Sequence, residues 1–191
     1  MANLVFKYAT MGAGKSLNIL ATAHQFKNNG IGYQLLKSSL DTRSKGTIKS
    51  RIGIEEICTI LPHEEDIWKY VDLNVKWLFV DEAQFLTSIQ VEQLAYIVDE
   101  FNINVICYGL RTDYQTHLFE GSKRLFELAD SFEEMPSYCK CGNKTSVNAR
   151  LNNDGNIDIT DGEQIKVGGD NEYKALCRKC FNKKAVDQLE H

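Results

Sequence analysis

A segment of small residues near the start of the chain has the residue types of a phosphate-binding loop. Gly14-Lys15-Ser16 matches the end of the Walker A pattern GxxxxGK[ST], although Ala9 stands where that pattern has its first glycine. Small residues let backbone N–H groups surround a phosphate, Lys15 would reach the terminal phosphates of a nucleotide, and the Ser16 hydroxyl would hold Mg²⁺. We therefore predict a nucleotide site formed by Ala9, Thr10, Met11, Gly12, Ala13, Gly14, Lys15 and Ser16.

Two acidic residues follow the apolar run 77–80, which is typical of a strand buried on both faces. Asp81 would lie at the end of that strand, where a Walker B acid holds Mg²⁺ through water. A strand-end capping role is the alternative for Asp81 alone, and the phosphate loop upstream favours the metal role. Glu82 comes next and could accept a proton from a hydroxyl or water beside the γ-phosphate.

Four of the six cysteines form two close pairs. Cys139 and Cys141 are one residue apart, Cys177 and Cys180 are two apart, and 35 residues separate the pairs. Paired thiols of this kind predict a tetrahedral zinc site with four sulfur ligands, and a disulfide is disfavoured in a reducing compartment. Cys58 and Cys107 lie in apolar surroundings and are expected to be buried.

Strands alternate with helices around these residues, which favours βαβ units on a parallel sheet of the P-loop NTPase kind, flanked by helices. We expect strands over 4–8, 33–37, 77–80, 104–108 and 132–135. Leu17, Leu20, Ala21, His24 and Gln25 share one face of the first helix, so His24 is expected to be packed. Thr87 and Gln90 have capping-box spacing for a helix to Phe101, and another helix is expected over 121–129.

Two segments of the first half are harder to interpret. Pro62 is expected to open a short helix with Glu64, Glu65 and Asp66 in its first turn, where negative charge suits the helix dipole. Residues 47–60 alternate only weakly between apolar and polar types and receive no assignment.

Composition changes near Pro136, after which long apolar runs cease. We expect an ATP-binding domain over 1–136, a zinc-binding lid domain over 137–188, and an expression-tag remnant over 189–191. With 43% hydrophobic and 25% charged residues, the chain has ordinary globular composition. Its net charge of −4 argues against a dedicated nucleic-acid binder, and no apolar run approaches the ~18 residues of a membrane span. Met1-Ala2-Asn3 leads straight into a strand without a signal peptide, so a cytoplasmic location is expected.

Taken together, these residues resemble the zinc-containing, cellular-type (type II) thymidine kinases, in particular their bacterial branch, over nearly the whole chain. The bacterial branch similarly lacks the first glycine of the loop. The motifs that carry the resemblance are Met11 in the loop, Asp41-Thr42-Arg43, Asp81-Glu82-Ala83-Gln84-Phe85, Tyr108-Gly109-Leu110-Arg111-Thr112-Asp113, Val167-Gly168-Gly169 with Tyr173, and both cysteine pairs.

The resemblance implies transfer of the ATP γ-phosphate to the 5′-hydroxyl of thymidine or deoxyuridine, in deoxynucleoside salvage. Glu82 would be the base, Arg43 would contact phosphate, and the nucleotide and Mg²⁺ site would include Asp81, Glu82, Ala83 and Gln84. The thymidine pocket would be lined by Met11, Leu110, Tyr114, Phe119, Val167, Gly169 and Tyr173. The resemblance also implies a lid between the cysteine pairs, structural zinc on Cys139, Cys141, Cys177 and Cys180, a homotetramer, and inhibition by thymidine triphosphate.

Two other functions fit parts of the pattern. A P-loop ATPase or GTPase would hydrolyse nucleotide without a nucleoside acceptor, but the chain has no Asn-Lys-x-Asp motif for guanine. A zinc-ribbon interaction module with a degenerate loop would not bind ATP tightly, and its usual nucleic-acid role fits poorly with a net charge of −4. The order of the motifs favours the kinase.

Overall fold

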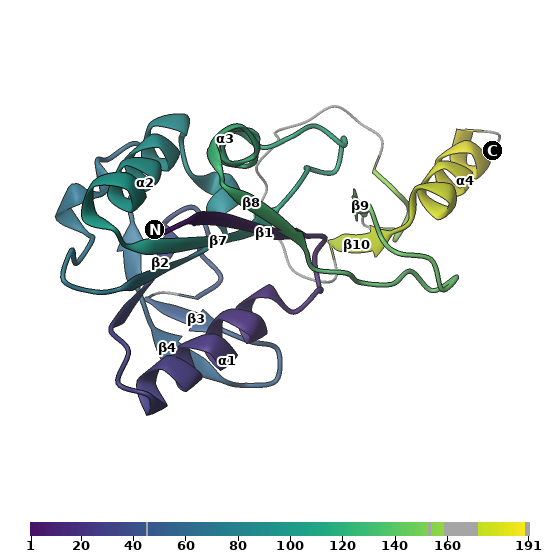
Figure 1. Cartoon of the computed structure of the whole chain (residues 1–191). Coiled ribbons are helices and arrows are strands. Elements are labelled where there is room, and N and C mark those ends of the chain that lie inside the picture. Colours follow the sequence, from purple (N-terminus) through teal and green to yellow (C-terminus); the bar gives the residue numbers. More distant parts are fainter. Residues whose placement is uncertain (45, 153, 159–171, 190–191) are drawn as a thin grey trace.

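The computed structural model describes residues 1–44, 46–152, 154–158 and 172–189. Its centre is a six-stranded sheet in the order β5-β2-β6-β7-β1-β8, and every pairing in it is parallel (Figure 1). The strands are β1 (Leu4–Ala9), β2 (Tyr33–Ser38), β5 (Thr59–Leu61), β6 (Trp77–Asp81), β7 (Asn104–Leu110) and β8 (Ser131–Glu134). The predicted α/β class and each predicted strand are confirmed.

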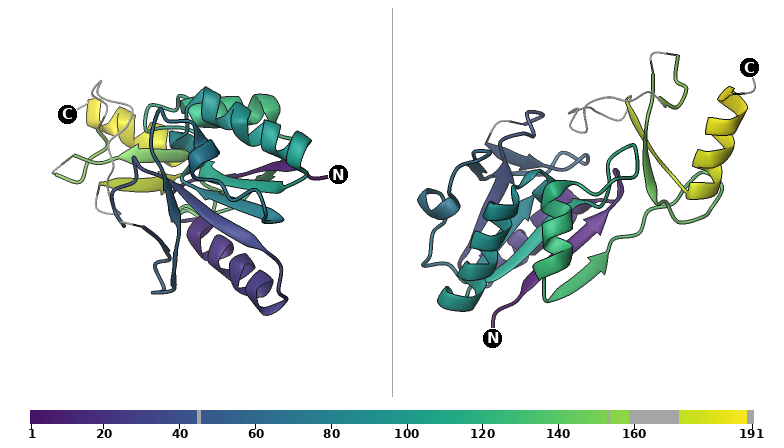
Figure 2. Two further views of the ribbon diagram at one scale, coloured as in Figure 1. Left: turned by 90° about the vertical axis from the view of Figure 1, so that its left-hand side faces the viewer. Right: turned by 90° about the horizontal axis from the view of Figure 1, so that it is seen from above.

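Helices cover both faces of this sheet. Helix α1 (Lys15–Asn28) lies on one face, and α2 (Ser88–Phe101) and α3 (Glu120–Leu128) lie on the other (Figures 1 and 2). The side chains of β6 alternate between the two cores: Phe79 packs in the cluster that contains Ile19, whereas Val80 packs in the cluster that contains Leu94. Because β6 is buried on both faces, its sequence is apolar at successive positions.

Helix α2 begins at the predicted capping box. The Thr87 hydroxyl accepts a hydrogen bond from the Gln90 backbone N–H at 3.2 Å, and the Gln90 side chain accepts one from the Thr87 N–H at 3.2 Å. The Gln90 amide also donates to the carbonyls of Pro62 and Glu65. This cap therefore fixes both the start of α2 and the segment before β6.

The prediction for the buried face of α1 was right for Leu20 and wrong for Leu17, Ala21, His24 and Gln25, which are exposed. Ile19, Leu20 and Ala23 are the apolar residues of the helix that are buried, because they face Phe79 and Tyr108 of the sheet. His24 is exposed, and its Nε2 lies 3.1 Å from the Asn28 side-chain nitrogen. The mixed face of Leu17, Ala21 and His24 is thus the outer one, and a packed role for His24 is excluded.

The short acidic helix predicted at Pro62 is also wrong. Glu64 has a φ of 67°, Asp66 is extended, and only a 3₁₀ turn, η1 (Ile67–Lys69), follows. Side chains of α2 form hydrogen bonds with the backbone of this segment. The Gln90 amide donates to two backbone carbonyls, and the Gln93 side chain accepts from the Ile67 N–H at 3.0 Å. These long-range bonds replace the internal hydrogen bonds of a helix.

The unassigned stretch 47–60 forms most of three short strands. Strands β3 (Thr47–Lys49) and β4 (Glu55–Ile57) make an antiparallel hairpin beside α1, and β5 joins the edge of the main sheet (Figure 1). The hairpin turn over 50–54 contains Gly53 at a φ of 89°, which favours glycine. Each strand has only three residues, so the sequence pattern is too brief to identify.

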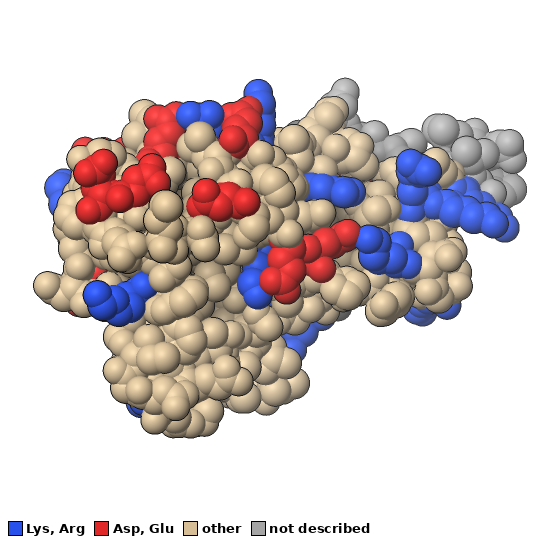
Figure 3. Space-filling model, viewed as in Figure 1, with Lys and Arg blue, Asp and Glu red and all other residues tan. Residues whose placement is uncertain are grey.

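The described residues from 137 to 189, which we call the C-terminal unit, lie to one side of the sheet (Figures 1 and 2). They form the antiparallel pair β9 (Val147–Arg150) and β10 (Tyr173–Leu176), followed by α4 (Arg178–Leu189). The basic residues Arg178, Lys179, Lys183 and Lys184 are exposed on α4, and acidic side chains gather over α2 and α3 on the face seen in Figure 3. No described helix is long and apolar enough to cross a membrane. Residues 190–191 of the expected tag remnant lie outside the described residues.

Candidate active site

A cavity of about 570 Å³ lies at the carboxyl ends of the parallel strands. Its walls come from segments that directly follow β1, β2, β6 and β7, together with β9 and β10 of the C-terminal unit. In open parallel sheets this edge is where ligands bind, because loops from several strands converge there. The cavity therefore brings together most of the residues that the sequence singles out.

The phosphate loop forms one wall of this cavity. Met11, Gly12, Gly14, Lys15 and Ser16 line it, and the φ angles of Gly12 and Gly14 are 79° and 84°, a region that favours glycine. Ala9 is the last residue of β1 and pairs with Leu110, so its Cβ is compatible with an extended backbone. Ala9, Thr10 and Ala13 do not contribute to the lining of the large cavity.

Ser16 and Asp81 bring together oxygen atoms that could hold a divalent cation. The Ser16 hydroxyl donates to Asp81 Oδ2 at 3.2 Å. Burial, and next the charge of Glu82, raise the pKa of Asp81 to about 7, although Lys15 opposes the shift. A hydroxyl and a carboxylate beside a phosphate loop are suitable donors for Mg²⁺. The residues therefore fit this ion.

Glu82 is held by two charged or polar neighbours in this structure. Arg43 Nη2 donates to Glu82 Oε1 at 2.6 Å, and Gln84 Nε2 donates to Glu82 Oε2 at 2.6 Å. The side-chain oxygen Oε1 of Gln84 in turn accepts from the Leu110 N–H at 2.9 Å. Glu82 has a φ of 52°, in the left-handed region, at the start of the 3₁₀ turn η2 (Ala83–Phe85). The carboxylate is thus oriented by Gln84 of η2 and by Arg43 from the segment after β2, and Leu110 at the end of β7 holds Gln84 in place. Gln84 also lines the cavity, whereas Ala83 is buried in the core beneath it.

A buried lysine next to this site was missed by the sequence analysis. Lys37 at the end of β2 is 2% exposed, and its Nζ lies 2.7 Å from Asp41 Oδ2. Asp41 Oδ1 accepts from Arg43 Nε at 2.6 Å. Burial alone would raise the pKa of Asp41, but hydrogen bonds from Arg43 and Lys37 hold it below its usual value. A lysine directly after the apolar pair Leu35-Leu36 of a predicted strand was the available signal.

The hairpin turn between β3 and β4 forms another part of the cavity wall that the sequence analysis left out. Arg51, Ile52 and Gly53 line the cavity from this turn. A Cβ placed on Gly12 would lie 3.2 Å from the Arg51 guanidinium, so the turn sits directly against the phosphate loop.

The residues assigned to the nucleoside lie on the same cavity. Met11, Leu110, Tyr114, Phe119 and Tyr173 all line it. Phe119 packs edge-on against Phe85 at 5.7 Å, and the Arg150 guanidinium lies 3.7 Å from the centre of the Tyr114 ring. The remaining two predicted residues, Val167 and Gly169, lie outside the described residues.

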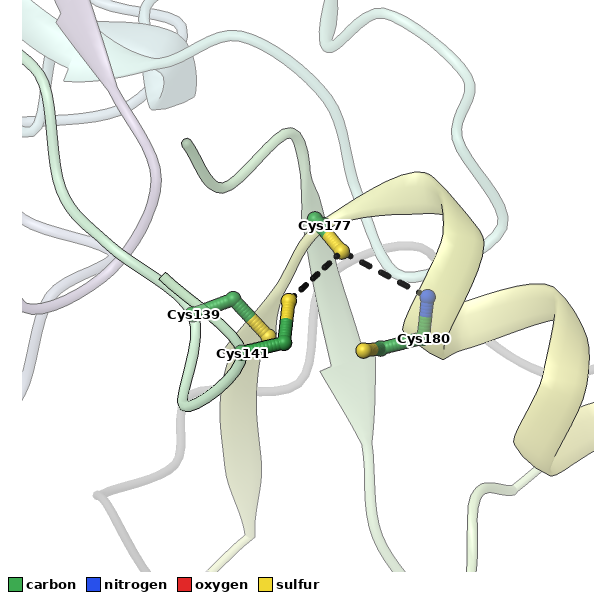
Figure 4. Close-up of side chains that lie close together, drawn as sticks. All are labelled: Cys139, Cys141, Cys177 and Cys180. Atoms are coloured by element: carbon green, nitrogen blue, oxygen red, sulfur yellow. Dashed lines mark hydrogen bonds between the residues drawn. The ribbon is translucent and has the colours of Figure 1, made fainter. Parts of the chain in front are cut away.

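The four paired cysteines meet between the loop that carries Cys139 and Cys141 and the start of α4 (Figure 4). Their sulfur atoms all lie within 4.8 Å of one another, and Cys141 Sγ is 3.5 Å from Cys177 Sγ. Four thiolates around Zn²⁺, with Zn–S bonds of about 2.3 Å, would lie about 3.8 Å apart. The Asn143 N–H, and next the Cys180 thiol, lower the pKa of Cys141 to about 6. The cluster therefore fits zinc. Cys58 and Cys107 are buried as predicted.

Comparisons with known proteins agree with this site. A family model described as thymidine kinase matches residues 2–181. The thymidine kinase of Enterobacteria phage T4 is 45% identical, over 95% of this chain and 96% of its own length. Those of Zymomonas mobilis (43% identical, over 96% and 98%) and Shewanella oneidensis (38% identical, over 95% and 97%) match in the same way. The similarity thus extends over both the α/β sheet and the C-terminal unit.

Proposed function

The chain belongs to the thymidine kinase family and has thymidine kinase activity, and from this premise we propose that it transfers the γ-phosphate of ATP to the 5′-hydroxyl of thymidine or deoxyuridine. The observation that supports this most is the shared cavity. The phosphate loop, Glu82 and the aromatic side chains Tyr114 and Tyr173 line the same 570 Å³ space. ATP and a nucleoside could therefore meet there beside one carboxylate.

In the proposed reaction, Glu82 takes the proton from the 5′-hydroxyl of the nucleoside. That oxygen forms a bond to the γ-phosphorus as the bond to the β-phosphate bridging oxygen breaks, and ADP leaves. Lys15 and the N–H groups of the loop stabilise the negative charge on the transferred group. When bound, Mg²⁺ would neutralise further phosphate charge, and Ser16 and Asp81 would hold it.

Arg43 would contact Glu82 and ATP in turn in this proposal. Its guanidinium donates a hydrogen bond to Glu82 Oε1 at 2.6 Å. The Arg43 side chain is still 42% exposed and can reach other partners in the cavity. Movement of Arg43 from Glu82 to a phosphate of ATP would free the carboxylate to accept the proton. The Asp41 carboxylate, which accepts from Arg43 Nε, would keep this hydrogen bond while the end of the Arg43 side chain moves.

The C-terminal unit has a separate place in the proposal. Zinc on the four cysteines would hold the ends of the stretch between them, which would close over the nucleoside and exclude water. We accordingly propose residues 1–136 as the ATP-binding domain and 137–188 as the lid domain. On the basis of the same family relationship, we also propose a homotetramer, inhibition by thymidine triphosphate and a cytoplasmic role in salvage.

A phosphate-transfer assay over a panel of nucleosides tests this proposal. With γ-labelled ATP, we expect the label in the monophosphates of thymidine and deoxyuridine, and little ATP hydrolysis when the nucleoside is omitted. Steady hydrolysis that is indifferent to nucleoside would instead indicate a P-loop ATPase.

A further inference from the structure

Strand β9 has two faces with different partners. Ala149 packs in the apolar cluster that includes Cys139 and Cys177. Asn148 and Arg150 alternate with Ala149 along the strand, so they project to the opposite side. There Asn148 lines the large cavity and Arg150 stacks on Tyr114. One short strand thus connects the cysteine cluster to the walls of the active site.

Asn148 forms two hydrogen bonds that join distant parts of the site. Its Oδ1 accepts from the Met11 backbone N–H at 2.8 Å, and its Nδ2 donates to the Thr112 carbonyl at 3.1 Å. The side chain is 3% exposed. The bond to Met11 needs an acceptor and the bond to Thr112 needs a donor, and a primary amide supplies both. The residue type is therefore matched to its two partners.

A second contact ties the same loop to the same unit. The Thr10 hydroxyl lies 2.8 Å from that of Ser137 and 2.7 Å from that of Thr145, and these two lie 2.5 Å from each other. Two successive residues of the phosphate loop, Thr10 and Met11, are thus bonded to the C-terminal unit. The position of the loop depends on that unit as well as on β1.

We propose that Asn148 is a positioning residue for phosphoryl transfer, which holds the phosphate loop at a set distance from the segment that lines the nucleoside side of the cavity. Met11 belongs to the loop, and Thr112 lies between Leu110 and Tyr114, which line that side. Transfer between two bound substrates depends on alignment, and a misplacement of about 1 Å can cost about a hundredfold in rate. This inference rests on the proposed function, because it assigns ATP to the loop and the nucleoside to the other side.

The test compares two substitutions of Asn148. Asn148→Leu keeps the approximate size but removes both hydrogen bonds, and we expect kcat/KM for ATP and for thymidine to fall about ten- to a hundredfold. Asn148→Asp keeps an acceptor for Met11 but sets a carboxylate against the Thr112 carbonyl. Burial and the facing Thr112 carbonyl should raise the pKa of that carboxyl well above its usual range, and its protonated form restores a donor and an acceptor. The activity of Asn148→Asp relative to the unsubstituted protein should therefore rise as pH is lowered from 8 to 6. Asn148→Leu should show no such recovery.

Controls separate this role from a general structural one. Asn182 is exposed on α4 of the same unit, and Asn182→Leu and Asn182→Asp should leave kcat/KM unchanged at every pH. Zinc content and melting temperature are measured for all four variants. The charged side chains near Asn148 are the same in the variant and in the unsubstituted protein, so their effects largely cancel in the ratio. They are Lys15, Arg111, Asp113, Glu134 and Arg150.

Each outcome decides the matter. Values of kcat/KM within twofold for Asn148→Leu, or a pH-independent ratio for Asn148→Asp, would overturn the proposal. A loss that only parallels lost zinc and a lower melting temperature would assign Asn148 to folding instead. If Asn148→Leu does not fold, the pH dependence of Asn148→Asp decides alone. An unsubstituted protein that fails to phosphorylate thymidine would instead contradict the proposed function.

Discussion

The α/β sheet and the C-terminal unit are stabilised in different ways. The sheet has an apolar cluster on each face, with β6 shared between them. Among the residues whose burial the structure describes, the cluster of the C-terminal unit has five buried members, and two of them, Cys139 and Cys177, are thiols of the proposed zinc site. A core with so few apolar side chains gains little from burial, and a bound metal can supply the missing folding free energy. We therefore expect the C-terminal unit to depend on the proposed zinc, and the sheet to fold without it.

The two regions also contribute different kinds of group to the site. Lys15, Asp81 and Glu82 come from segments at the carboxyl edge of the sheet, where the proposed phosphoryl and proton transfers occur. Asn148 and Tyr173 come from the C-terminal unit and line the cavity, and Asn148 also bonds the phosphate loop. Changes in the sheet should therefore affect turnover, and changes in the C-terminal unit should affect nucleoside binding and alignment.

The largest expected effect is that of Lys15→Ala. It removes a fixed positive charge from the terminal phosphates, and an arginine that stabilises the same transition-state charge in related enzymes is worth about 10³- to 10⁵-fold in phosphoryl transfer. Turnover should fall by that order and ATP should bind more weakly, as measured by steady-state rates and calorimetry. Lys27→Ala, on the exposed last turn of the same helix, is the matched control. Near-normal activity of Lys15→Ala would contradict the assignment of the phosphate loop.

Glu82→Gln should separate turnover from binding. The amide keeps the size of the side chain but cannot take up the proton, so kcat should fall about 10²- to 10⁴-fold. A loose transition state, in which the nucleophile keeps its proton late, would place the loss at the low end. Affinities for ATP and thymidine, measured by calorimetry, should stay nearly unchanged. Asp81→Asn should instead weaken the dependence of the rate on Mg²⁺. Normal turnover of Glu82→Gln beside an inactive Asp81→Asn would remove Glu82 from the role of base.

Cys177→Ser tests the dependence of the C-terminal unit on metal. Metal analysis should give one zinc per chain for the unsubstituted protein and less for the variant, because one thiolate ligand is lost. We expect KM for thymidine to rise about tenfold, while the sheet stays folded by circular dichroism. Cys58→Ser, outside the cluster, should keep its zinc. A disulfide among the four cysteines, or no zinc in protein purified without chelator, would refute the metal site.

The smallest expected effect concerns pH. Because burial raises the pKa of Asp81 to about 7, its carboxyl is mostly protonated, and so neutral, below that pH and mostly ionised above it. Mg²⁺ requires the ionised form, so lowering the pH from 8 to 7 should weaken Mg²⁺ binding about twofold. Rates measured over a range of Mg²⁺ concentrations at each pH provide the apparent affinity. The dependence should vanish in Asp81→Asn, and its persistence there would assign it to another group.

Features that depend on a few neighbouring residues could be predicted from the sequence. The Gly14-Lys15-Ser16 turn, the all-apolar β6 and the Thr87–Gln90 capping box each have a local physical cause, and each is present in the structure. The cysteine pairs could be predicted to form a candidate metal site for the same reason, since the two members of each pair are close in sequence, and the four thiols do meet in the structure.

Tertiary structure alone decided which surfaces face one another. The amphipathic pattern of α1 is weak, so only contact with Phe79 and Tyr108 determines that Ile19 is inside and His24 outside. The segment after Pro62 is not helical because side chains of α2, far away in sequence, bind its backbone. No local pattern could indicate these partners.

The same holds for the details of the site. Arg43 meets Glu82 across 39 positions and Asn148 meets Met11 across 137, because β2, β6, β1 and β9 end around one cavity. The sequence by itself determined the chemical groups and the elements that carry them, since those follow from short-range propensities and motif spacing. Their pairing was decided by the parallel sheet and the attached C-terminal unit, since hydrogen bonds and ion pairs depend on distances that only the folded chain defines.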